Sequence, residues 1–124
     1  MTEKLSYDPA SRLIRIRVWG DDPISDWIVS KQEVMLLHEM HGANRLLVDV
    51  REQEVAPALF DILDFGDDWP TTIWLAVLVE KNTPDDVTFL ETVATRRRKS
   101  IRIFFSEVEA LDWLKAPQGK MPGD

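Results

Sequence analysis

An acidic and a basic side chain stand at the end of a short apolar run, in the segment RLLVDVR, where Asp49 and Arg51 are separated by one residue. A carboxylate beside a guanidinium has the groups for general-base chemistry or for contacting a charged ligand. A charge within a buried strand, however, is more often held by an arginine or by backbone amides than used in chemistry. Asp49 and Arg51 are therefore candidate contacts for a ligand or partner, and we predict no catalytic residues. The alternative is a small carboxylate-dependent enzyme with Asp49 as base and Arg51 or a histidine as electrophile.

Two of the five tryptophans also lie where they could contact a ligand or a partner. Trp27 and Trp69 lie in or near predicted loops, so their rings are candidates for lining a pocket or a contact surface. The other three, Trp19, Trp74 and Trp113, lie within predicted helices or strands, and we expect them in the core.

The two histidines do not form a recognisable metal site. His38 and His41, in the segment HEMH, are three residues apart, whereas the zinc-protease motif requires two histidines four apart and a third ligand. The acids of DFGDDW (64–69) do not follow the calcium-loop spacing, because Leu63 and Phe65 stand where that loop needs oxygen ligands. None of the five glycines builds a phosphate loop. The sequence therefore predicts no metal and no cofactor.

Four consecutive cations, RRRK at 96–99, stand out in an otherwise acidic chain. They fall in the last turn of a predicted helix, where positive charge complements the negative end of the helix dipole. Four consecutive residues also point in different directions around a helix, so they cannot all face one partner. We interpret them as a solvated helix end. The alternative is a sensor of phosphate or anionic lipid headgroups, with candidate anion contacts at Arg96, Arg97, Arg98, Lys99 and Arg102.

The net charge of −7 is unevenly distributed along the chain. Residues 1–20 carry four bases and two acids (+2), residues 21–70 three bases and twelve acids (−9), and residues 71–124 eight of each (0). The acidic middle would repel a phosphate backbone. We therefore expect no nucleic-acid partner.

Length and residue usage indicate one domain, which we place at residues 1–116 of the 124, followed by a flexible tail at 117–124. The absence of cysteine excludes disulfides and thiolate sites. The N-terminus lacks the apolar core of a signal peptide, and the longest apolar run, residues 73–79, is too short to cross a bilayer. We expect a cytoplasmic protein without a membrane span.

Helix and strand signals alternate along the sequence. Asp22 and Pro23 open a helix that stops at Gly42, and Ser106 with Glu109 forms a capping box ahead of the last helix. The pattern predicts strands at 4–7, 12–19, 45–50, 72–79 and 101–105, and helices at 23–41, 56–65, from 84 and from 107. This ββαβαβαβα order predicts an α/β fold with a single mixed, largely parallel sheet, an N-terminal β-hairpin and about four flanking helices.

The first predicted helix is apolar on two sides. Its apolar residues form two nearly opposite groups: Ile24, Ile28 and Met35, and Val29, Leu36 and Met40. Such a helix is either deeply buried or half of an interface. For a domain of this size we expect a homodimer.

Three segments resemble one family. RLLVDVR followed by a helix, IWLAVLVE, and the C-terminal RIFFSEVEALDWL are similar to the SpoIIAA-like family of bacterial proteins with STAS- or SEC14-type domains, and the similarity of pattern runs from the hairpin to Leu114. The resemblance implies a single sheet flanked by helices in a small cytoplasmic protein. Family members that antagonise anti-sigma factors carry a phosphorylatable serine or threonine just after the strand that matches residues 46–50. REQEVAPALFDILDFGDDW (51–69) has no Ser, Thr or Tyr, so we expect no such switch.

The function that these observations favour is a non-enzymatic, STAS-like binding or interaction domain with a regulatory role. We expect it to recognise a protein partner or a small apolar or anionic ligand near Asp49, Arg51 and Trp69.

Overall fold

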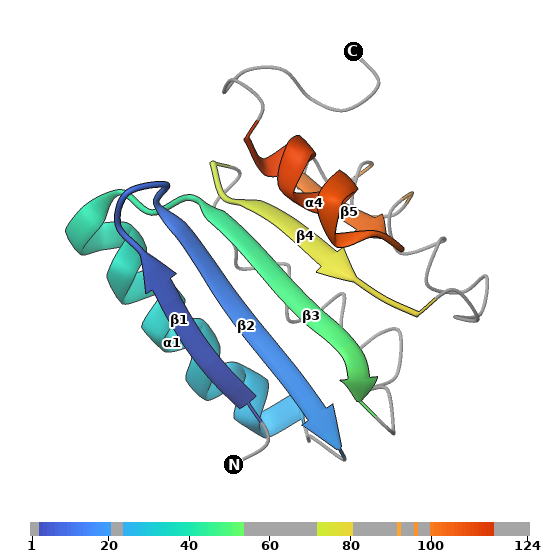
Figure 1. Cartoon of the computed structure of the whole chain (residues 1–124). Helices are drawn as coiled ribbons and strands as arrows, with labels where there is room; N and C mark the ends of the chain where they lie inside the picture. The colour runs from blue at the N-terminus through green and yellow to red at the C-terminus, as the bar shows by residue number, and fades with distance from the viewer. Residues whose placement is uncertain are drawn as a thin grey trace.

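A five-stranded sheet forms the centre of the protein in this computed structural model, which describes residues 3–20, 24–53, 72–80, 92, 96 and 100–115 (without the side chains of 24–28 and 53). The strands are β1 (Glu3–Asp8), β2 (Leu13–Gly20), β3 (Arg45–Gln53), β4 (Trp74–Leu78) and β5 (Ser100–Phe104). They lie side by side in chain order; β1 is antiparallel to β2, and the other neighbours are parallel (Figure 1). The predicted mixed sheet with an N-terminal hairpin is confirmed.

The N-terminal hairpin follows from its turn chemistry. Asp8 Oδ1 accepts a hydrogen bond from the Ala10 backbone N–H at 3.0 Å, and Asp8 Oδ2 accepts one from Ser11 Oγ at 2.8 Å. Arg12 takes a left-handed conformation (φ 56°) and completes the turn. Strict alternation in β2 then buries Ile14, Ile16 and Val18 and sends the intervening arginines to the other face.

Helix α1 (Ile24–His41) covers one face of the sheet and ends at Gly42. Gly42 has φ 69°, and its N–H donates to the His38 carbonyl at 3.0 Å, which is the usual left-handed end of a helix. Nδ1 of His38 lies 2.8 Å from the Ala43 carbonyl oxygen, so this nitrogen donates there. His38 is therefore part of the helix end.

Apolar side chains pack against both faces of the sheet, which confirms that the central strands are buried. The face under α1 buries Ile14, Ile16, Val18, Val34, Ala43, Leu46, Val48, Ile73 and Leu75. The opposite face buries Leu47, Trp74, Ala76, Leu78, Phe104, Ala110 and Leu114. The second group underlies helix α4 (Glu107–Leu114), which contacts β3, β4 and β5 but leaves β1 and most of β2 uncovered on this side (Figure 1).

Helix α4 begins where the sequence predicted, with Ser106 as N-cap and its Oγ 3.5 Å from the Glu109 N–H. Val108 does not share the buried face of α4 with Ala110 and Leu114, because it is 69% exposed. At about 100° per residue, Val108 points roughly 160° away from Ala110, around which the buried face is centred.

Some predictions concern residues outside the described ranges. The helix expected at 56–65, most of the helix expected from 84, and the tail at 117–124 fall there, although Thr92 and Arg96 have helical backbone. Bounds are therefore given for two helices, α1 and α4, and the predicted count of four is not established. Within the described part of the chain, no helix is long and apolar enough to span a membrane.

Candidate functional site: an arginine-rich sheet face

Asp49 lies in β3 and is held by Arg51. Both side-chain oxygens of Asp49 are engaged: Nε of Arg51 donates to Oδ1 at 3.0 Å and Nη2 to Oδ2 at 2.8 Å. The backbone N–H of Arg51 also donates to Oδ1, at 3.1 Å. The Asp49 side chain is only 12% exposed, whereas that of Arg51 is 39% exposed. The pair thus presents its cation, and not its carboxylate, to solvent.

The environment of Asp49 lowers its pKa. Burial by itself raises the pKa of this carboxyl, but the hydrogen bonds and the positive charge of Arg51, with a smaller contribution from Arg15, together outweigh burial. Asp49 is therefore ionised at neutral pH and weakly basic. Its geometry is that of an anchor that orients Arg51 rather than of a general base.

Two further arginines, which the sequence analysis did not single out, lie beside this pair. The parallel register sets Arg17 opposite Asp49, and Arg15 lies two residues earlier on the same face of β2. Nη2 of Arg17 donates to both oxygens of Glu52, at 2.8 and 2.7 Å. Nη1 of Arg15 donates to Glu107 of α4, at 2.7 Å. The alternation RLIRIRVW already placed these arginines on one face, but their neighbours depended on the strand register.

An irregularity in β3 helps bring these groups together. Arg17 is opposite Asp49, but Trp19 is opposite Glu52, so β3 carries one extra residue over this interval. A bulge of this kind bends the strand and changes the direction of neighbouring side chains. Arg51 and Glu52, although adjacent in sequence, therefore both form ion pairs with residues of this face.

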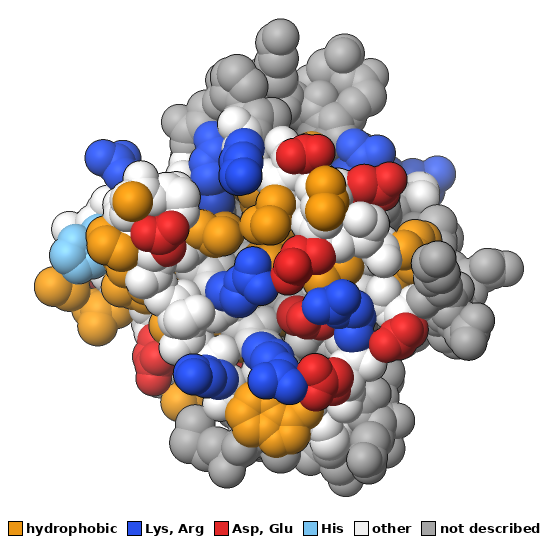
Figure 2. All heavy atoms as spheres, viewed as in Figure 1, with side chains coloured by type: hydrophobic (Ala, Val, Ile, Leu, Met, Phe, Trp, Pro, Cys, Tyr) orange, Lys and Arg blue, Asp and Glu red, His pale blue; other side chains and the backbone are white. Residues whose placement is uncertain are grey.

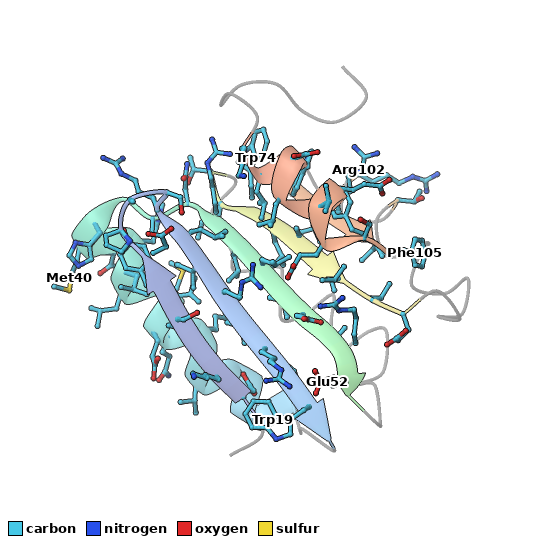
Figure 3. All side chains as sticks on the ribbon, viewed as in Figure 1. Trp19, Met40, Glu52, Trp74, Arg102 and Phe105 are labelled. Carbon is cyan, nitrogen blue, oxygen red and sulfur yellow. The ribbon has the colours of Figure 1, made fainter. Side chains whose placement is uncertain are left out.

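Trp19 borders the same surface. We expected it in the core, but it is half-buried, and the Cζ atom of Arg17 lies 5.6 Å from its ring centroid. Figure 3 shows Trp19 and Glu52 at the same end of β2 and β3. The expectation was right for Trp74, which is buried and stacks on the half-buried Trp113 at 5.1 Å. Trp19 differs because α4 does not extend over the end of β2.

We call this surface the arginine face. It consists of three arginines, three carboxylates and one aromatic ring: Arg15, Arg17, Arg51, Asp49, Glu52, Glu107 and Trp19. Figure 2 shows positive and negative side chains gathered over β2 and β3 on the side that bears α4. The side chains of Arg15, Arg17 and Arg51 remain 38%, 53% and 39% exposed although each is ion-paired.

The remaining predicted site residues do not join this face. Arg102 is on β5, with β4 between it and Asp49, and its Cζ atom lies 5.6 Å from the Phe104 ring centroid. Arg96 is exposed on its helical turn. Trp69, Arg97, Arg98, Lys99 and the side chain of Trp27 lie outside the described residues.

The histidines are used structurally. His38 helps close α1, and the His41 ring stacks on Tyr7 at a centroid distance of 5.8 Å. Among the residues that the structure describes, no three histidine or acidic side chains are grouped to hold a metal ion.

Comparison with known proteins identifies the class of fold. A solved structure of an uncharacterised protein of the DUF3478 family, with a SpoIIAA-like fold, from Shewanella loihica PV-4 matches this chain with a TM-score of 0.56. The match covers 90% of this chain and 91% of the other, at 16% sequence identity. The fold is therefore SpoIIAA-like, as the sequence resemblance implied. No protein-family model matches the sequence, and no curated protein matches it.

Proposed function

We propose that this chain is a non-enzymatic, STAS-like interaction domain of regulatory type, and that it binds an acidic segment of a protein partner on the arginine face. The observation that carries the proposal is the set of three arginine side chains, each ion-paired with a carboxylate and each more than a third exposed. The SpoIIAA-like fold supports a regulatory role only by analogy, because fold and function are separable.

The donor chemistry favours a carboxylate-bearing partner. A guanidinium has five N–H donors arranged to match a carboxylate. The contacts of Arg15 and Arg17 with Glu107 and Glu52 each use a single terminal nitrogen. Further donors on the same groups can therefore meet an incoming acid, while the flat ring of Trp19 offers apolar contact beside them.

The shape of the surface favours a protein segment over a small molecule. Small-molecule sites are concave and enclose most of their ligand. The arginine face instead spans two strands and the start of α4, and the side chains of its Arg15–Glu107 and Arg17–Glu52 pairs are 38–55% exposed. An extended acidic segment lying across β2 and β3 would contact all three arginines at once.

The enzyme alternative has weaker support. A general base needs an accessible oxygen and a pKa near the working pH. The Asp49 side chain is only 12% exposed and is held by Arg51, and its pKa is lowered. The alternative of a headgroup or phosphate sensor rests on Arg96 to Lys99 and Arg102, of which Arg96 and Arg102 are described.

The proposal can be tested by crosslinking in cells of the source organism. Trp19 is replaced with the photoreactive aromatic residue benzoylphenylalanine, and the exposed Val108 carries the same probe as a control. We expect a crosslinked partner from position 19 only. Arg17→Glu should abolish the crosslink, because an acidic partner is then repelled, whereas Arg96→Glu, with the same change of charge, should preserve it.

Two results would contradict the proposal. A crosslink at position 19 that survives Arg17→Glu would show that the arginines do not recognise the partner. A crosslink that is lost with Arg96→Glu and kept with Arg17→Glu would favour the other cationic cluster. Recovery of the crosslink should also fall as salt is raised in a lysate, because exposed charge pairs are screened.

A further inference from the structure

Strand β1 forms one end of the sheet, and no described strand pairs with its outer side (Figure 1). The outer backbone N–H and C=O groups of such a strand can pair with another strand. The strand carries Lys4, Ser6 and Asp8 on the face that bears the arginines, since these residues pair with Arg17, Arg15 and Leu13. Leu5 and Tyr7 lie on the α1 face and are only half-buried.

An exposed apolar line runs along α1, next to this strand. Val29, Leu36 and Met40 are 51%, 55% and 67% exposed. At about 100° per residue they fall within roughly 40° of one another around the helix axis. Figure 3 shows Met40 projecting beyond the β1 side of the sheet. Three large apolar side chains aligned on an exposed helix face are typical of a contact surface.

We propose that a second copy of this chain covers the outer side of β1 and the Leu36 and Met40 end of the apolar line. The two β1 strands pair antiparallel about a two-fold axis at Ser6, which joins two sheets into one. The two α1 helices then lie side by side under the junction.

The charges of β1 fit this register. When Ser6 lies opposite Ser6 of the second copy, Lys4 lies opposite Asp8, and this ion pair occurs twice by symmetry. The same register sets Leu5 opposite Tyr7 on the α1 face. Centring the axis on Leu5 would instead set Lys4 opposite Ser6 and Glu3 opposite Tyr7, with no ion pair. Asp8 already accepts two bonds in its turn, and its carboxylate has capacity for more.

The contacts between β1 and α1 show which part of α1 is level with Ser6, and this position independently supports a two-fold axis at Ser6. Glu3 accepts a hydrogen bond from Ser30 Oγ at 2.6 Å, and Tyr7 stacks on His41, so β1 and α1 run in the same direction at known points. Interpolating between these contacts places Ser6 level with about residue 38 of α1, given rises of about 3.3 Å and 1.5 Å per residue. That level is midway between Leu36 and Met40. Leu36 of each copy therefore meets Met40 of the other.

This dimer is independent of the proposed function. A two-fold axis perpendicular to the sheet leaves both arginine faces on the same side and uncovered. Failure of partner binding to the arginine face would not affect the dimer, and the reverse also holds.

A cysteine scan tests the register directly, because the chain has no cysteine of its own. Directly opposed residues have Cα atoms about 4.5–5.5 Å apart, within the range that a disulfide spans. Ser6→Cys should therefore form a covalent dimer under mild oxidation. Lys4→Cys, exposed on the same face, is the matched control: its two Cα atoms would be about 13 Å apart and should not crosslink.

Native mass spectrometry between about 1 and 100 µM tests the helix contact. Leu36→Glu should raise the dimer dissociation constant at least about tenfold, because it places an acid among apolar side chains. Val108→Glu makes the same change at an exposed apolar position of α4 and should leave the dimer intact. Circular dichroism checks that both variants stay folded.

A monomer throughout this concentration range would overturn the proposal. So would a dimer in which the Lys4→Cys variant crosslinks as readily as the Ser6→Cys variant, or one that Leu36→Glu does not weaken.

Discussion

Replacing Arg51 with methionine removes the guanidinium that neutralises Asp49 and keeps most of the aliphatic side chain. Asp49 as a whole residue is 8% exposed. In the variant its carboxylate would keep the backbone N–H of residue 51 as a donor but lose both side-chain donors. Breaking a fully buried ion pair costs about 3–5 kcal/mol. Because Arg51 is 39% exposed, solvent already screens part of this attraction, and we expect a loss of about 2 kcal/mol in the free energy of unfolding at about pH 7.

The dependence of this loss on pH tests its cause. In the natural protein the pKa of folded Asp49 is below its unfolded value, so its stabilising contribution is complete above the unfolded pKa. That contribution is lost only as pH falls through the folded pKa. In Arg51→Met, burial dominates and raises the pKa of Asp49 above the unfolded value. The penalty is then relieved when the carboxyl becomes protonated, so the difference between the two proteins should shrink to about half near pH 4.

Urea unfolding of both proteins at about pH 7 and pH 4 provides the measurement. Arg17→Met is the matched control, because the Arg17–Glu52 pair is more than half exposed and its loss should not measurably change stability. An Arg51→Met penalty that is the same at both pH values would refute the reasoning, because it would not arise from the charge on Asp49.

Three further predictions concern the fold that positions the arginine face. Ser106→Ala should lower the free energy of unfolding by about 0.5–1 kcal/mol in urea unfolding. This loss is small for an N-cap, because the hydrogen bond from the Glu109 N–H to Ser106 Oγ is 3.5 Å long. Ser106→Asp should restore the stability. Gly42→Ala should lower the free energy of unfolding by about 1 kcal/mol, because residue 42 has a left-handed φ of 69°. An added Cβ would meet no clash, since its nearest atom is Nη1 of Arg12 at 3.9 Å. Gly42→Asn should cost less, because asparagine tolerates this conformation better, and an equal cost for both variants would contradict this reason. Leu47→Ala, at a fully buried position of β3, should cost about 3 kcal/mol in thermal or urea unfolding, and a cost below about 1 kcal/mol would show that its surroundings collapse into the cavity.

Local signals in the sequence were enough to predict the described helices and strands and a mixed, largely parallel sheet. The sequence predicted a strand at 12–19, the end of the first helix at Gly42 and the start of the last helix after Ser106, and the structure has all three. These features depend on residues close together in the chain, so periodicity and capping preferences identify them. The homodimer expected from the first helix stays a prediction, as do all the candidate ligand or partner contacts, including Asp49 and Arg51.

The candidate site could be only half found in this way. Asp49 and Arg51 are two residues apart, and their pairing was among the interpretations that the sequence allowed. Arg17 and Glu52 are 35 residues apart, and Arg15 and Glu107 are 92 apart, so no local pattern links them. Their contacts depend on which strands are neighbours and on where α4 crosses the sheet.

The sequence by itself determined which residues alternate, where helices begin and end, and that a charge lies within the third strand. Only the tertiary structure decided what surrounds that charge. The parallel register sets Arg17 beside Asp49. Just after this point β3 carries one extra residue, and Arg51 and Glu52 both form ion pairs on the same face. Register and bulge arise from the packing of whole strands against each other and against helices, because a shift of one residue would expose the apolar face of a strand to water.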